Sequence, residues 1–153
     1  MECGGPVAVR RLVLIALLLL GFCGAADPAS RVLVLVVRAD SPVVDLDSVT
    51  LRKLFLGVPV LVSGKLLHPI RNRSAEHLDE IFLQEIVGMS QSAYDRQILS
   101  GVNRQGWRPP AEANSPARIL AALYEDQQAV AFVWQSEIAR DPRVRVVRIL
   151  WSE

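Results

Sequence analysis

Apolar residues recur along this chain in short unbroken runs that alternate with helical spacings. Residues 32–37 form a continuous run of Val and Leu, which is the pattern of a strand buried on both faces. Two further runs of strand length, 129–134 and 144–150, lie near the end of the sequence. Two shorter extended segments, 60–62 and 65–71, surround a Ser-Gly turn. These runs predict a sheet of four or five strands.

Helical spacing fills the intervals between the strands. Asp47 is a good N-cap for a helix with Leu51, Leu54 and Phe55 on its inner face, and Gly57 is expected to end that helix. Strands that alternate with helices are typical of an α/β fold, in which helices cover a mixed sheet.

Three more helices are expected further along. Ser74 is expected to cap the second helix, with Phe82 on its inner face and Gly88 at its end. Ser90 is expected to cap a third helix that ends near Gly101. Residues 102–113 contain Gly and Pro and predict a loop, after which Ser-Pro at 115–116 begins a helix. One helical turn is expected at 136–139.

The first 26 residues are interpreted as a secretory signal peptide, so the predicted domain spans residues 27–153. Arg10 and Arg11 precede the apolar run 12–22, and small residues follow it. The run is short for a membrane span, which needs about 20 apolar residues. A retained membrane anchor is the alternative. Cleavage after Ala26 predicts a periplasmic or secreted protein, and a lipid anchor on Cys23 is a second alternative.

Charge and cysteine content narrow the function classes. The chain has 17 Lys+Arg and 16 Asp+Glu, and removing residues 1–26 takes away two Arg and one Glu, which leaves 15 of each. This balance argues against nucleic-acid binding, which needs a basic surface. Both cysteines, Cys3 and Cys23, lie in the signal segment, so the domain is expected to rely on its core rather than on disulfides.

Arg71, Asn72, Arg73 and Ser74 form the candidate binding segment, because they lead directly into a predicted helix. A helix start offers free N–H groups, and exposed guanidinium groups beside it could hold a small oxyanion through paired hydrogen bonds. Glu76, in the first turn, would repel an anion. The alternative is a solvated turn with Ser74 as an ordinary cap.

Other chemistry is not indicated by the sequence. His68, Glu76 and His77 do not have the spacing of a zinc site, so no metal or cofactor is expected. No serine stands in a nucleophile elbow and no enzyme signature is present, so the chain is not expected to be an enzyme. Three arginines in the segment 143–148 predict an edge strand protected from aggregation, or alternatively a docking edge.

The ordered set of motifs resembles the phosphate-type solute-binding proteins of ABC transporters. Residues 46–57, LDSVTLRKLFLG, are similar to the family pattern L-S-x-x-x-L-x-x-I-F-x-G. Residues 82–90, FLQEIVGMS, are similar to the family's F-L-x-x-V-L-G-M-S helix end, and 69–71 and 129–133 are similar to two of its strands. The resemblance implies one lobe of a type II periplasmic binding protein.

The sequence also departs from that family. Val62 replaces a usual Trp, the Ser-Gly-Thr anion loop is absent, and Ala131-Phe132 stands where the family has Gly-Tyr. Full two-lobe members are about twice this length and clamp their ligand between lobes. The resemblance therefore implies binding of phosphate or a related oxyanion. A single lobe is expected to bind it weakly, unless two copies close around one ligand as a homodimer. A ligand-free interaction module for an envelope sensor or transporter is the alternative.

Overall fold

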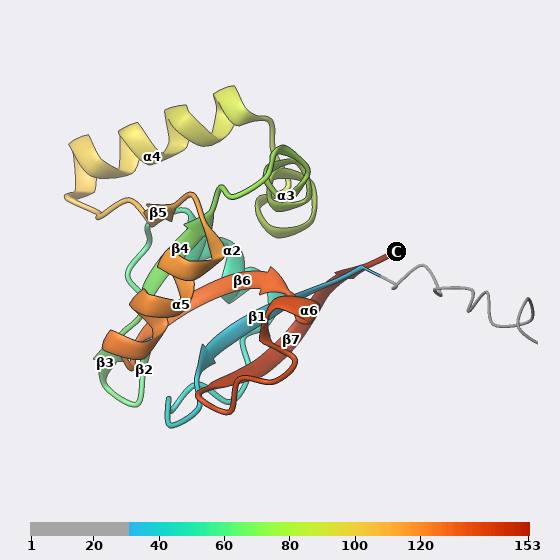
Figure 1. Ribbon diagram of the computed structural model, residues 1–153. Helices are drawn as coiled ribbons and strands as arrows, with labels where there is room; N and C mark the ends of the chain where they lie inside the picture. Colours follow the sequence, from blue (N-terminus) through green and yellow to red (C-terminus); the bar gives the residue numbers. More distant parts are fainter. Residues whose placement is uncertain (1–30) are drawn as a thin grey trace, which may run out of the picture. The chain divides into compact units, whose positions relative to one another are not determined.

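A five-stranded mixed sheet forms the centre of the computed structural model, which describes residues 31–153 (Figure 1). The strand order is β5-β4-β6-β1-β7, with β4 parallel to β5 and β6 and β1 antiparallel to β6 and β7. The strands are β1 (Val32–Arg38), β4 (His68–Asn72), β5 (Ala111–Ala113), β6 (Ala129–Trp134) and β7 (Val144–Ser152), and β2 (Leu61–Val62) and β3 (Lys65–Leu66) form a separate hairpin. The predicted α/β fold is confirmed.

Helices lie on both faces of this sheet. Figure 1 shows α5 and α6 in front of the strands and α2 behind them. The helical elements are α2 (Ser48–Phe55), α3 (Glu76–Ile81), a π-helical segment η1 (Phe82–Val87), α4 (Gln91–Gln105), α5 (Pro116–Glu125) and α6 (Gln135–Ile138).

The alternation of side chains along β1 divides the core into two layers. Leu33, Leu35 and Val37 pack with the aromatic residues Phe55 and Phe82 from α2 and η1. The intervening valines of β1 pack on the opposite face with residues of α5, α6 and β6. Successive side chains in a strand point to opposite faces, so a continuous apolar run is buried on both sides.

The first predicted helix has the expected caps. The Asp47 carboxylate accepts hydrogen bonds from the N–H groups of Val49 and Thr50, at 2.9 and 3.0 Å. Gly57 has a φ of +82°, a left-handed conformation that favours glycine.

The prediction that Ser74 caps the next helix is wrong. The helix begins one residue later than predicted, so the N-cap of α3 is Ala75, which provides no side-chain hydrogen bond. Ser74 belongs to the preceding turn, in which its N–H donates to Asn72 Oδ1. The helix then continues into η1 and ends at Gly88, as predicted, with left-handed backbone.

The predicted end of the third helix is also wrong. Ser90 caps α4 as expected, but α4 passes through Gly101 and ends at Gly106. Gly101 is needed for packing inside the helix, because a Cβ atom there would lie 2.4 Å from the ring of Trp107. The predicted loop at 102–113 therefore includes the last turn of α4 and the short strand β5.

The predicted signal segment, residues 1–26, and both cysteines lie outside the described residues. Among residues 31–153, no helix is long and apolar enough to cross a bilayer.

Candidate functional site

The candidate segment lies where two parallel strands end. Arg71 and Asn72 are the last residues of β4, and Ala113 ends the neighbouring strand β5. The Arg73 N–H donates to the carbonyl of Ala113 at 2.8 Å, which keeps Arg73 beside the end of β5. Ligands of open α/β sheets bind outside the carboxyl ends of the strands, so the fold places the segment at the usual edge.

Arg71 is buried, which corrects the expectation that it is exposed. Arg71 is only 1% exposed. Its guanidinium donates hydrogen bonds to the Asp79 carboxylate at 2.7 and 3.1 Å and to Gln91 Oε1 at 2.8 Å. It also lies 4.6 Å from the ring centre of Phe82 and 4.7 Å from that of Tyr94. Most of its hydrogen-bonding capacity is therefore used inside the protein.

Asn72 shapes the turn that follows β4. Its amide group donates to the Phe132 carbonyl at 2.9 Å, and its side-chain oxygen accepts from the Ser74 N–H at 2.9 Å. Asn72 is fully buried, so its amide does not contact solvent. The role is positional: Asn72 fixes where Arg73 and Ser74 emerge from the sheet.

Arg73 and Ser74 are the members of the segment that solvent reaches. The Arg73 side chain is 42% exposed and lies 3.4 Å from Glu112 and 3.7 Å from Asp79, which are long distances for ion pairs. Ser74 is half-buried. Because α3 has acidic residues Glu76 and Asp79 in its first turn, its start is not a favourable anion site by itself.

Glu112 is the main feature that the sequence did not indicate. It is the residue directly opposite Arg71 in the β4–β5 pairing, and its carboxylate lies 3.8 Å from Arg71 and 3.4 Å from Arg73. Its side chain is 53% exposed. Only the pairing of two strands brings Glu112 here. Its paired residue, Arg71, is 41 positions earlier in the chain, and no local sequence motif predicts such a pairing.

The charges at this edge are balanced among the described residues. Arg71 and Arg73 face Asp79 and Glu112, so two cations meet two carboxylates. Asp79 makes the short contact, and Glu112 makes only long ones. Glu112 is thus the carboxylate that can move away at least cost, because an exposed pair at long distance contributes little.

A cavity of about 390 Å³ opens beside the buried Arg71. Tyr94 and Glu112 line it, together with apolar residues of α4 and the two prolines before β5. Burial raises the pKa of Tyr94 to about 12, and its hydroxyl donates to the Phe55 carbonyl at 3.1 Å. The phenol is therefore neutral at physiological pH and serves as packing and hydrogen-bond donor.

The remaining predicted candidates lie elsewhere. His68 is exposed at the start of β4 and contacts Asp126 at 2.6 Å, while His77 lies on α3 between Trp134 and Trp151. Within residues 31–153, no group of three His, Cys, Asp or Glu residues could hold a metal ion. Along the edge strand β7, two of the predicted basic residues, Arg145 and Arg148, donate to carbonyls of the segment 41–46.

Comparisons with known proteins identify the fold. No family model matches the chain, and no curated protein matches it significantly. An ABC-type phosphate transport receptor from Vibrio cholerae is similar in structure, with a TM-score of 0.59, 16% identity, and coverage of 78% of this chain and 46% of that one. A phosphate ABC transporter substrate-binding protein with bound phosphate from Clostridium perfringens has a TM-score of 0.57 and 15% identity, with coverage of 78% and 45%.

The architecture is therefore that of one lobe of a periplasmic binding protein. At these identities the similarity is one of fold. The chain spans less than half of the length of the proteins it matches. The sequence resemblance to phosphate-type solute-binding proteins is supported at the level of the fold.

Proposed function

We propose that this lobe belongs to a solute-binding protein and binds phosphate or a related small oxyanion at the carboxyl edge of β4 and β5. Arg73 and Ser74 make the direct contacts, Arg71 supplies charge from behind them, and Asn72 holds the turn. The observation that carries the proposal is the position of this segment at the strand ends, in a fold shared with a structure that contains phosphate.

Binding at this edge is expected to be weak, in the millimolar range. A single lobe leaves its ligand open to water and salt, which screen the charges. The two carboxylates of Asp79 and Glu112 also offset the two guanidiniums. Two copies that closed around one ligand would exclude water and strengthen the binding.

Glu112 provides the test, because its carboxylate lies between the two guanidiniums, near the place where an anion would pair with them. Glu112→Gln removes this competing charge and is expected to tighten phosphate binding by a few-fold, since an exposed ion pair is worth about 0.2–1 kcal/mol. Isothermal titration calorimetry of the full chain with phosphate and with sulfate, at low and high salt, measures the change.

Glu125→Gln is the matched control, because Glu125 is exposed at the end of α5 and lies outside the segment. Its affinity for phosphate should equal that of the wild type. If neither the wild type nor Glu112→Gln produces heat with millimolar phosphate or sulfate, the solute-binding proposal fails.

A second candidate function is that of an interaction module for a membrane sensor or transporter. The observation in its favour is the local charge balance, since a site that already pairs its arginines with carboxylates does not need a ligand. A photo-crosslinker placed at position 73 in cells should then capture a membrane transport or sensor protein, whereas one at position 125 should not. Crosslinking that is equal at the two positions would argue against this role.

Export is part of the same proposal. The apolar run 12–22 between Arg11 and the small residues 24–26 supports cleavage after Ala26. Protein recovered from the cell envelope should therefore begin at Asp27, or at a lipid-modified Cys23, by intact mass. Envelope protein that still carries Met1 would contradict cleavage.

A further inference from the structure

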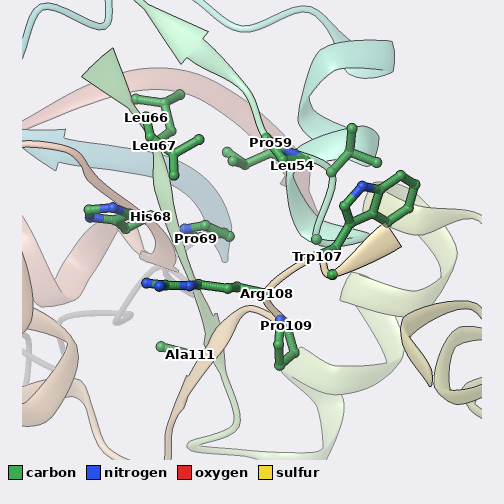
Figure 2. A pocket seen from close by; sticks show the side chains of 13 residues that line it. Leu54, Pro59, Leu66, Leu67, His68, Pro69, Trp107, Arg108, Pro109 and Ala111 are labelled. Atoms are coloured by element: carbon green, nitrogen blue, oxygen red, sulfur yellow. The ribbon is translucent and has the colours of Figure 1, made fainter. Parts of the chain in front are cut away.

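A larger cavity of about 520 Å³ lies at the opposite end of β4 from the proposed oxyanion site (Figure 2). Its walls come from the end of α2, the β2–β3 hairpin, the start of β4 and the segment between α4 and β5. Most of the lining is apolar: Leu54, Val58, Pro59, Leu66, Leu67, Pro69, Trp107, Pro109 and Ala111. Small-molecule sites have this character and volumes of about 300–1,000 Å³.

The wall formed by Trp107 and Arg108 is held in place by two close backbone approaches. The Trp107 ring packs against Gly101, where a Cβ atom would lie 2.4 Å from it. The Arg108 carbonyl packs against Gly57, where a Cβ atom would lie 2.8 Å from the oxygen. Side chains at either glycine would displace this wall. The cavity is therefore preformed by packing, which reduces the ordering cost of binding.

The opposite wall is held by backbone hydrogen bonds. Leu67 N–H donates to the Val60 carbonyl at 2.9 Å, and His68 N–H donates to the Gln128 carbonyl at 3.0 Å. The His68 ring is engaged with Asp126 at 2.6 Å, so His68 contributes little free charge to the cavity.

Arg108 is the cationic group available to a ligand in this cavity. Its side chain is exposed, and within residues 31–153 no hydrogen bond or ion pair to a carboxylate engages its guanidinium. Figure 2 shows the side chain extending from the Trp107–Pro109 wall toward the strand that carries His68 and Pro69. An apolar cavity with one unpaired guanidinium suits a ligand that is apolar over most of its surface and anionic at one end.

We propose that this cavity binds a small aromatic carboxylate. The ring of the ligand packs between Trp107 and the leucines of α2 and β3, where apolar area is removed from water. Its carboxylate pairs with the Arg108 guanidinium. The site is separate from the oxyanion site, so the proposal does not rest on phosphate binding.

The three tryptophans of the chain allow a site-specific test. Fluorine NMR of full-length protein labelled with fluorotryptophan gives one signal each for Trp107, Trp134 and Trp151, assigned through Trp→Phe variants. Titration with naphthoate should shift the Trp107 signal in a saturable way. The other two signals are expected to stay constant, because these tryptophans pack against each other and His77, away from the cavity.

Matched variants and a matched ligand test the ionic contact. Arg108→Gln should weaken naphthoate binding by about tenfold, and should leave binding of the neutral analogue naphthamide within about twofold. Arg104→Gln makes the same charge change on the exposed surface of α4 and should behave like the wild type. A Trp107 signal that stays constant up to millimolar naphthoate overturns the site, and equal effects of Arg108→Gln and Arg104→Gln overturn the assignment of the carboxylate to Arg108.

Discussion

Replacing Arg71 with methionine tests whether this arginine belongs to the core. The change removes the partner of the Asp79 carboxylate, which is only 20% exposed, and of Gln91. Breaking a buried ion pair by removing one member costs about 3–5 kcal/mol. Partial solvation of Asp79 lowers this cost, and the lost contacts with two aromatic rings raise it. We expect a loss of about 3 kcal/mol in the free energy of unfolding.

Urea denaturation followed by circular dichroism measures this loss. With a slope of about 1–3 kcal/mol/M, the midpoint should fall by roughly 1–3 M. The double variant Arg71→Met with Asp79→Leu should recover most of the stability, because an apolar pair leaves no unpaired charge in the core. A double-mutant cycle of the two sites gives the coupling energy directly.

Arg73→Met is the internal control for this experiment. Arg73 is 42% exposed and makes only long contacts with carboxylates, so its replacement should change stability by no more than about 0.5 kcal/mol. If Arg71→Met moves the midpoint no further than Arg73→Met does, the structural role assigned to Arg71 is refuted.

Two further predictions concern the aromatic core. Phe55 and Phe82 are fully buried, and their ring centres lie 5.6 Å apart. Phe→Ala at either position should lower the free energy of unfolding by about 3–5 kcal/mol, measured by urea denaturation. Midpoints near that of the wild type would contradict this packing. Tyr94 has a pKa raised by burial to about 12, so the stability due to its neutral form is complete below pH 10 and is lost as pH rises toward 12. Tyr94→Phe should therefore lose less stability than the wild type between these pH values, and parallel profiles would show that Tyr94 does not titrate in this window.

The sequence by itself determined the class of fold and most of its elements. The run of Val and Leu in β1 is long enough and apolar enough to require burial on both faces, and this requirement predicted helices on each side of the sheet. The caps at Asp47, Ser90 and Ser115 were predictable because a cap acts within three or four residues of its own position. The burial of Phe55 and Phe82 followed from helical spacing for the same local reason.

Tertiary structure decided what each member of the candidate segment does. Arg71 and Arg73 are indistinguishable in sequence, since both are arginines in a polar stretch two residues apart. Strand alternation alone would put residues two apart on the same face. Arg71 is buried because η1 and α4 pack over it, with Asp79 and Gln91 as partners. Arg73 lies beyond the end of β4 and stays exposed. The roles of Glu112 and Gly101 were also decided by tertiary structure. Glu112 is placed by the pairing of two strands that are far apart in sequence, and Gly101 is required by the close packing of Trp107. Neither the strand pairing nor the Trp107 contact leaves a local signal in the sequence.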